Sequence, residues 1–293
     1  MQSELIFSIK MVAFAGMFYL YYYLFLRDQR FHQFNRYYIL VASLFALVFP
    51  FISLGGLFSW GLWPDDFLYK SQDSVTGITV FPGSGNSSGI SNAYVGAFLF
   101  SVYLLGVTLK FLRIAKAYLW LHKLQGLYPS EKVGDIQFYL TDLPSAPFSF
   151  FRRLYWNSAI SLDSKKGEQI FKHEVYHIYH KHSFDILYLE FVDVLFWFNP
   201  FNSLFRKEAS IIHEYLADRA VLEDADPSEY AELLVMETIS RKTAHLLIAF
   251  FSPNIKRRIN MIILKQPKRT GFISRICAFP LALLFLAVID FAC

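Results

Sequence analysis

The sequence has little charge and almost no cysteine. Charged residues make up 18% of its 293 residues, whereas a soluble domain usually has about 25%. The only two cysteines are Cys277 and Cys293, which excludes a disulfide scaffold. Hydrophobic residues, in contrast, reach 55%. This composition excludes a disordered chain and argues against an ordinary soluble enzyme. It favours membrane spans joined to a polar part.

Four stretches are candidate membrane spans, because a spanning helix needs about 20 mostly apolar residues. They are residues 5–26, 37–64, 93–109 and 272–291. The last is the weakest candidate, since a charged residue near each end shortens its uncharged part. The first lacks a positively charged start and a small-residue cleavage site. We therefore interpret it as an uncleaved anchor.

Lysine and arginine are unevenly distributed among the connections. Three arginines lie between the first two candidate spans, and 23 Lys and Arg residues lie from Lys110 to Arg275, both included. The connection between the second and third spans has only Lys70. The positive-inside rule therefore predicts that the first and third connections are cytoplasmic. The N-terminus and the loop at residues 65–91 would then face outside.

The start of the third connection combines a helix with strands. Residues 110–124 have helical spacing and extend the third span, and residues 136–140 and 154–162 have the pattern of short strands. A helix is predicted after Ser164. Another is predicted after Asp226, where Asp-Pro-Ser-Glu is a capping pattern.

The aromatic stretch at residues 184–201 resembles a further span but carries three acidic residues. If residues 177 and 214 bind one ion, the chain between them must cross the membrane an even number of times, and its length hardly allows two crossings. We interpret the stretch as a helix buried against the spans or lying in the interface. The Asn199-Pro200 pair should stop it.

Residues 173–177 read His-Glu-Val-Tyr-His, which is an HExxH pattern. Histidines four positions apart lie on one face of a helix, so His173 and His177 can bind the same metal ion. Glu174 can then take a proton from the attacking water. The alternative is a surface helix with solvated histidines, helped by the nearby His180 and His182.

A second helical stretch offers a third metal ligand. Glu214 would complete a three-ligand site with one open position, as catalytic zinc requires. Asp218 follows one turn later and suits a hydrogen bond with a ligand histidine. His213 is the competing ligand, but it points about 100° away from Glu214 on a helix. Two imidazoles and one carboxylate favour zinc over other divalent ions.

These residues resemble the membrane metalloproteases of the BlaR/MecR type, the beta-lactam-sensing antirepressors and their wider peptidase family. The matching motifs are HEVYH, WFNP, HEYLAD, SPNIKRRI and RYY, at residues 173–177, 197–200, 213–218, 252–259 and 36–38. The resemblance covers nearly the whole chain. It implies a zinc endopeptidase of the gluzincin type, with His173, His177 and Glu214 as zinc ligands and Glu174 as general base.

The predicted fold class is a mainly α membrane protein. About four transmembrane helices would carry a cytoplasmic α+β, gluzincin-like zinc metalloprotease domain between spans three and four. The predicted domains are residues 1–112 with three spans, residues 113–271 with the metalloprotease, and residues 272–293 with the fourth span. The expected location is the inner, cytoplasmic membrane of a bacterium.

Two departures from the family pattern matter. The antirepressors carry a penicillin-binding sensor after the last span, but no Ser-x-x-Lys occurs in residues 1–293, so beta-lactam sensing by acylation is not expected. The more distant HtpX-like and CaaX-type proteases have His-Pro where this chain has Ser252-Pro253. The oxyanion stabiliser is therefore open: Arg258 either serves as this catalytic residue or pairs with Asp218. The basic run at residues 256–258 has a second interpretation, as an anchor to anionic lipid.

The expected reaction is hydrolysis of a peptide bond in a cytoplasmic or membrane-proximal protein, repressor-like, or in the chain itself. Residues 148–160 form either an edge strand that pairs with this substrate or a plain core hairpin. The lipid bilayer is a second partner, no nucleic acid is expected, and a homodimer is left open. One alternative is a non-proteolytic signal transducer with a structural zinc site. Another is a transporter that uses Lys10, although snorkelling also explains that residue.

Overall fold

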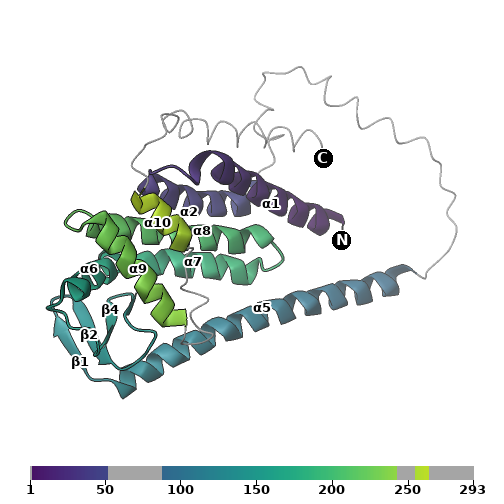
Figure 1. Cartoon of the computed structure of the whole chain (residues 1–293). Helices are drawn as coiled ribbons and strands as arrows, with labels where there is room; N and C mark the ends of the chain where they lie inside the picture. Colours follow the sequence, from purple (N-terminus) through teal and green to yellow (C-terminus); the bar gives the residue numbers. More distant parts are fainter. Residues whose placement is uncertain (1, 52–87, 243–254, 264–293) are drawn as a thin grey trace, which may run out of the picture.

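The computed structural model describes residues 2–51, 88–242 and 255–263, and its described part is mainly helical with one small sheet (Figure 1). Three parts are apparent: an N-terminal pair of helices, one long helix, and a body of helices and strands. The predicted loop at residues 65–91 lies almost entirely outside the described residues, and the predicted span at residues 272–291 lies wholly outside them.

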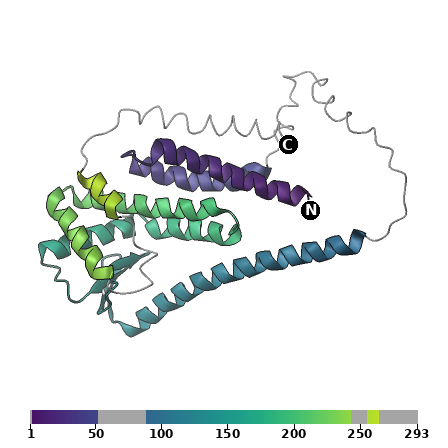
Figure 2. The ribbon, with the colours of Figure 1, turned by 45° about the vertical axis from the view of Figure 1, so that its right-hand side comes forward.

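The N-terminal helices form a pair that packs on the body. Helix α1 (Gln2–Tyr21) continues through the π-helical turn η1 (Tyr22–Leu26), and α2 (His32–Val48) ends in the short η2 (Phe49–Phe51). Figure 2 shows this pair alongside the helices drawn in green. The largest apolar core joins the pair to α8 (Pro200–Val221), with buried residues Phe14, Tyr22, Ile39, Phe205 and Ile212.

Helix α5 (Ser88–Leu127) is long and largely exposed. It runs past the predicted domain boundary at residues 112/113 without a break, as the predicted extension of the third span requires. It contacts the body near Tyr103, whose hydroxyl donates to the carbonyl of Leu195 over 3.0 Å. Gly106 allows this approach, because a Cβ there would lie 2.3 Å from the indole of Trp197.

Two described helices are long and apolar enough to cross a membrane: Phe7–Leu26 and Tyr94–Leu127. They include most of the first and third predicted spans. In α5 this apolar surface is exposed to the surroundings, as expected of a helix that meets lipid. The second predicted span is described only as far as residue 51, so the four-span arrangement stays a prediction.

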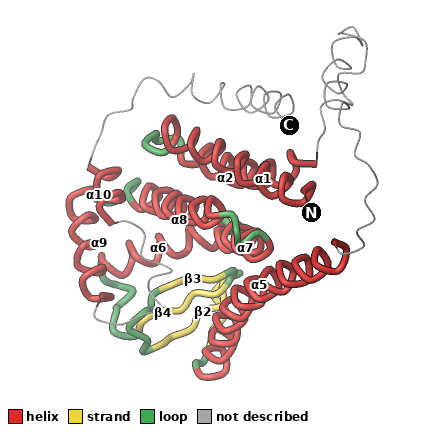
Figure 3. Tube along the Cα trace, turned by 90° about the vertical axis from the view of Figure 1, so that its right-hand side faces the viewer, coloured by secondary structure: helices red, strands yellow, loops and turns green. Residues whose placement is uncertain are grey.

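The sheet has four strands in the order β1-β2-β4-β3. These are β1 (Ser130–Val133), β2 (Ile136–Thr141), β3 (Phe148–Phe150) and β4 (Arg153–Asn157). Strands β2 and β4 are parallel, and the two outer pairs are antiparallel. Figure 3 shows the strands beside α6 (Lys165–Tyr179). Leu154 and Trp156 from β4 form a core with Ile170 and Ile178 from α6.

The strand predicted at residues 136–140 is confirmed as β2, but the one predicted at 154–162 is too long. Strand β4 ends at Asn157, because the chain turns there: Asn157 Oδ1 accepts from the Ala159 amide over 2.9 Å. The predicted strand is longer because apolar residues continue to alternate with polar ones beyond this turn. The segment 148–160 contains both β3 and β4. Strand β3 comes first and lies at one edge of the sheet, and a hairpin turn connects it to the antiparallel β4.

The predicted helix starts are confirmed. Helix α6 begins after Ser164, whose hydroxyl accepts from the Gly167 amide over 3.0 Å. A side chain larger than hydrogen cannot replace Gly167, since its Cβ would lie 2.0 Å from the carbonyl oxygen of Ser161. Helix α9 (Pro227–Lys242) begins after Asp226, whose carboxylate accepts from the amides of Ser228 and Glu229.

The helix predicted at residues 184–201 is α7 (His182–Leu195), and its predicted end is wrong. Asn199-Pro200 does not stop this helix but starts α8: the Asn199 side chain accepts from the Phe201 amide over 3.1 Å, and proline suits the first helical position. Helix α7 packs on α8, α5 and α2. This agrees with a helix buried against the candidate spans. The last described helix is α10 (Ile255–Ile263).

Candidate metal centre

Helix α6 presents His173 and His177 on one face, one turn apart. Their Nε2 atoms lie 3.2 Å from each other, as the HExxH spacing predicts. Helix α6 also packs on the sheet, through Ile170 and Ile178. This packing fixes the direction in which the two imidazoles point, which is toward α8.

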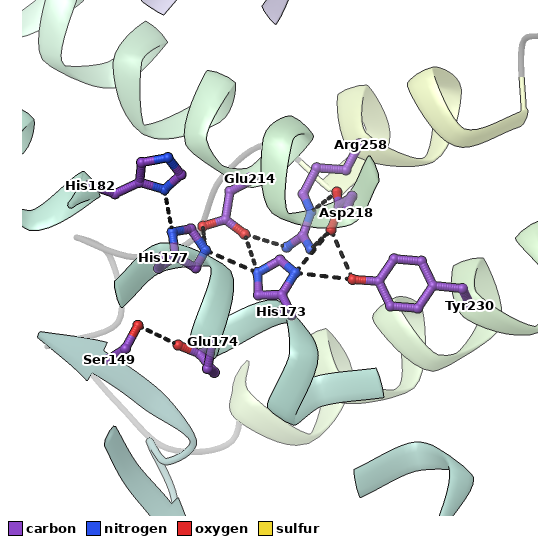
Figure 4. A network of polar contacts seen from close by, with 9 residues as sticks. All are labelled: Ser149, His173, Glu174, His177, His182, Glu214, Asp218, Tyr230 and Arg258. Atoms are coloured by element: carbon purple, nitrogen blue, oxygen red, sulfur yellow. Dashed lines mark hydrogen bonds and ion pairs between the residues drawn. The ribbon is translucent and has the colours of Figure 1, made fainter. Parts of the chain in front are cut away.

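Helix α8 supplies the third side chain. Glu214 Oε2 lies 3.3 Å from His173 Nε2, and Glu214 Oε1 lies 3.7 Å from His177 Nε2 (Figure 4). One ligand atom from each residue lies within 4.8 Å of the others, and within the described ranges no other group of three such residues does so. We call these three residues the His-His-Glu cluster. The sequence prediction named the same three.

The charges in the cluster favour a cation. Burial opposes a charged Glu214, but Arg258 and the two histidines keep its pKa below the usual range. Burial also opposes a charged His173, but hydrogen bonds to Asp218 and Glu214 outweigh it and raise its pKa to about 10. Burial lowers the pKa of His177 to about 3. A divalent metal bound to neutral His173 would take the place of the proton that Asp218 and Glu214 favour on this imidazole. The donor set therefore fits a zinc-type ion.

Asp218 and Tyr230 hold the other side of His173. Its Nδ1 atom lies 3.3 Å from Asp218 Oδ1 and 3.1 Å from the Tyr230 hydroxyl. That hydroxyl donates to Asp218 over 2.9 Å. A carboxylate at the second ring nitrogen orients a ligand histidine, which is the arrangement predicted for Asp218. Tyr230 comes from α9 and has no sequence motif that could have identified it.

Arg258 joins α10 to α8 at this site. Its Nε donates to Asp218 Oδ2 over 2.8 Å, and a terminal nitrogen lies 2.9 Å from Glu214 Oε2. The side chain is buried. Of the two roles open for Arg258, pairing with Asp218 is the one present in the structure, and a contact with reacting atoms stays a prediction. The neighbouring Arg257 pairs with Glu208 in α8, so only Lys256 of the basic run is exposed.

Glu174 lies on the sheet side of α6. Its Oε2 accepts a hydrogen bond from the Ser149 hydroxyl over 2.8 Å (Figure 4). Ser149 is the central residue of β3, which forms one edge of the sheet. The predicted general base is therefore tied to an edge strand. The sequence gave no indication of this contact, because a single serine in a short strand has no distinctive pattern.

His213, the competing ligand, points away from the His-His-Glu cluster. Its Nε2 lies 2.9 Å from Asp185 Oδ2 in α7, and Arg36 of α2 donates to the same oxygen over 2.6 Å. His182, which entered the sequence analysis only as a solvated histidine, is buried with Nδ1 2.8 Å from His177 Nδ1. These contacts connect α2, α7 and α8 behind the cluster.

The comparison with known families agrees with this geometry. Residues 156–262 match the family model described as BlaR1 peptidase M56. The matched range contains the His-His-Glu cluster and Glu174, Asp218 and Arg258. No curated protein matches the chain. Residues 156–262 are therefore similar to the BlaR1 peptidase M56 family, which supports the resemblance found in the sequence and suggests a membrane-associated metallopeptidase.

Proposed function

We propose that the chain is an integral-membrane, zinc-dependent endopeptidase of the gluzincin type. The observation that carries the proposal is the convergence of His173, His177 and Glu214 from two helices, with ligand atoms within 4.8 Å of one another. Bound zinc would polarise the scissile carbonyl and lower the pKa of water. Three protein ligands leave one position open, as such catalysis requires.

Glu174 is proposed as the general base and acid. It directly follows the first ligand histidine in the HExxH pattern, and its side chain is buried beside the His-His-Glu cluster. The hydrogen bond from Ser149 holds its carboxylate in one orientation. In this role Glu174 takes a proton from the attacking water and gives it to the leaving amine.

The substrate is proposed to be an extended segment of a protein at the cytoplasmic face of the membrane, or of this chain. Strand β3 is an edge of the sheet, and its Ser149 contacts Glu174. An extended peptide that added a strand at this edge would bring its backbone close to Glu174. Cleavage there would serve regulated proteolysis or transmembrane signalling.

The alternative is a signal transducer with a structural zinc site. A structural site usually has four protein ligands and needs no general base. Within the described residues the cluster has three, and Glu174 is positioned beside it by β3. Both observations favour the peptidase.

Metal removal tests the proposed activity directly. We expect the detergent-purified chain to cleave a casein-type substrate, to lose this cleavage in a zinc chelator and to recover it when about one equivalent of zinc is restored. Magnesium is the control ion, because it prefers oxygen ligands and should not restore cleavage. Chelator-resistant cleavage would contradict the proposal, and zinc binding without cleavage would favour the structural alternative.

A further inference from the structure

A cavity of about 350 Å³ lies beside the His-His-Glu cluster, between the α1–α2 connection, α8 and α10. We call it the basic pocket. Its polar lining consists of Arg30, His32, Tyr215, Asp218, Arg219 and Arg258. Three arginines thus face a single carboxylate.

The positive charge of the basic pocket is only partly neutralised. Asp218 is already engaged by Arg258 through two hydrogen bonds. Arg30 donates to the backbone carbonyl of Met261 over 3.3 Å, which is a neutral acceptor. Among the described residues, neither Arg30 nor the exposed Arg219 forms an ion pair with a carboxylate. Two arginines therefore leave an excess of positive charge in a concave site.

His32 provides an independent observation. Its side chain is buried against the ring of Tyr215, with 7% of the residue exposed, and its Nδ1 has no hydrogen-bond partner in the described structure. Burial, and then the charges of Arg219 and Arg30, lower its pKa to about 4. A buried polar atom without a partner is uncommon in a native protein and calls for an explanation. A bound anion would neutralise both arginines beside this imidazole.

The position of the basic pocket along the chain indicates the kind of anion. The candidate span Phe7–Leu26 ends four residues before Arg30. The pocket is therefore near the end of a span, where lipid headgroups lie. Planar guanidinium groups match the oxygens of a phosphate and bind it through paired hydrogen bonds.

We propose that the basic pocket binds a phosphate-class anion through Arg30, Arg219 and His32. Its source is either the headgroup of an anionic membrane lipid or free inorganic phosphate. This site is separate from the peptidase proposal, since none of these three residues belongs to the His-His-Glu cluster. The bound anion would nevertheless lie beside Asp218 and Arg258, which contact the cluster.

Binding can be measured on the full chain in detergent without any cleavage assay. Native mass spectrometry counts bound phosphatidylglycerol against bound phosphatidylcholine. Thermal unfolding in inorganic phosphate, against chloride at equal ionic strength, tests the free anion. The variants are Arg30→Gln with Arg219→Gln, and Arg219→Gln alone. Arg152→Gln is the matched control, because Arg152 is an exposed arginine outside the pocket.

We expect the wild type to bind one of the two probes, and the double variant to bind it at least about tenfold more weakly. Preferential retention of phosphatidylglycerol identifies the lipid headgroup, and a rise in Tm with inorganic phosphate alone identifies the free anion. Arg219→Gln, at an exposed position, keeps the test valid if the double variant does not fold. The proposal is overturned if neither probe binds, if Arg219→Gln binds like the wild type, or if Arg152→Gln weakens binding equally.

Discussion

Replacing Glu174 with glutamine should reduce peptide cleavage at least about a hundredfold while zinc content stays unchanged. Glutamine has nearly the same shape and can still accept the hydrogen bond from Ser149, which the carboxylate accepts over 2.8 Å. An amide cannot take up the proton of the attacking water, so only the chemical step is lost. The measurement is the cleavage rate and the metal content of the same purified samples.

Glu168→Gln is the matched control, because Glu168 is an exposed glutamate in the first turn of the same helix. Its cleavage rate and metal content should equal those of the wild type. Cleavage that persists in Glu174→Gln would remove Glu174 from the role of general base. Loss of both zinc and cleavage would instead show that Glu174 is needed for zinc binding.

Replacing Arg258 with methionine should cost about 3–5 kcal/mol of unfolding free energy. Arg258 lies 2.9 Å from Glu214 and donates two hydrogen bonds to Asp218, and all of these side chains lie largely out of solvent. The substitution leaves two carboxylates without their cationic partner in a poorly solvated place. Denaturant unfolding of the chelator-treated protein measures this cost, since a bound metal would offset part of it.

Lys256→Met is the control for Arg258, because Lys256 lies on the same helix and is exposed. Its unfolding free energy should change by less than about 0.5 kcal/mol. Adding Asp218→Asn to Arg258→Met should recover part of the lost stability, since it removes one unpaired charge. A cost below about 1 kcal/mol for Arg258→Met would show that the pairing does not hold α10 to α8.

The features that the sequence predicts well are local. His173 and His177 are related by one helical turn, and the caps at Ser164 and Asp226 act on amides within three residues of themselves. Such relations depend on the geometry of a single helix, which residue type and spacing specify. Glu214 lies on a second helix: the sequence names it as the third ligand that catalytic zinc requires, but the packing of α6 on α8 sets its distance from the histidines.

The contacts that the sequence does not predict join distant segments. Ser149 reaches Glu174 from a strand, and Tyr230 reaches His173 from a helix that lies 57 positions further along the chain. The Arg36–Asp185 pair spans 149 positions. Each depends on how elements pack in three dimensions, and a lone serine, tyrosine or arginine has no pattern that reveals its partner.

The membrane-spanning arrangement can be predicted from the sequence only in part. Apolar length alone identifies Phe7–Leu26 and Tyr94–Leu127 as helices that can span a bilayer. The structure adds that α1 and α2 also pack on α8 through a shared core, which a hydropathy pattern cannot indicate because burial in protein and burial in lipid both select apolar residues. The orientation rests on the distribution of lysine and arginine and stays a prediction.

The most direct test of the account is the metal content of the detergent-purified wild type and of Glu214→Ala. We expect about one zinc per chain in the wild type and almost none in the variant, because two imidazoles alone hold zinc weakly. His213→Gln is the control that separates the two candidate ligands, and it should retain the metal, since His213 contacts Asp185 rather than the His-His-Glu cluster. A wild type without zinc, or a Glu214→Ala variant that keeps it while His213→Gln loses it, would contradict the proposed metal centre.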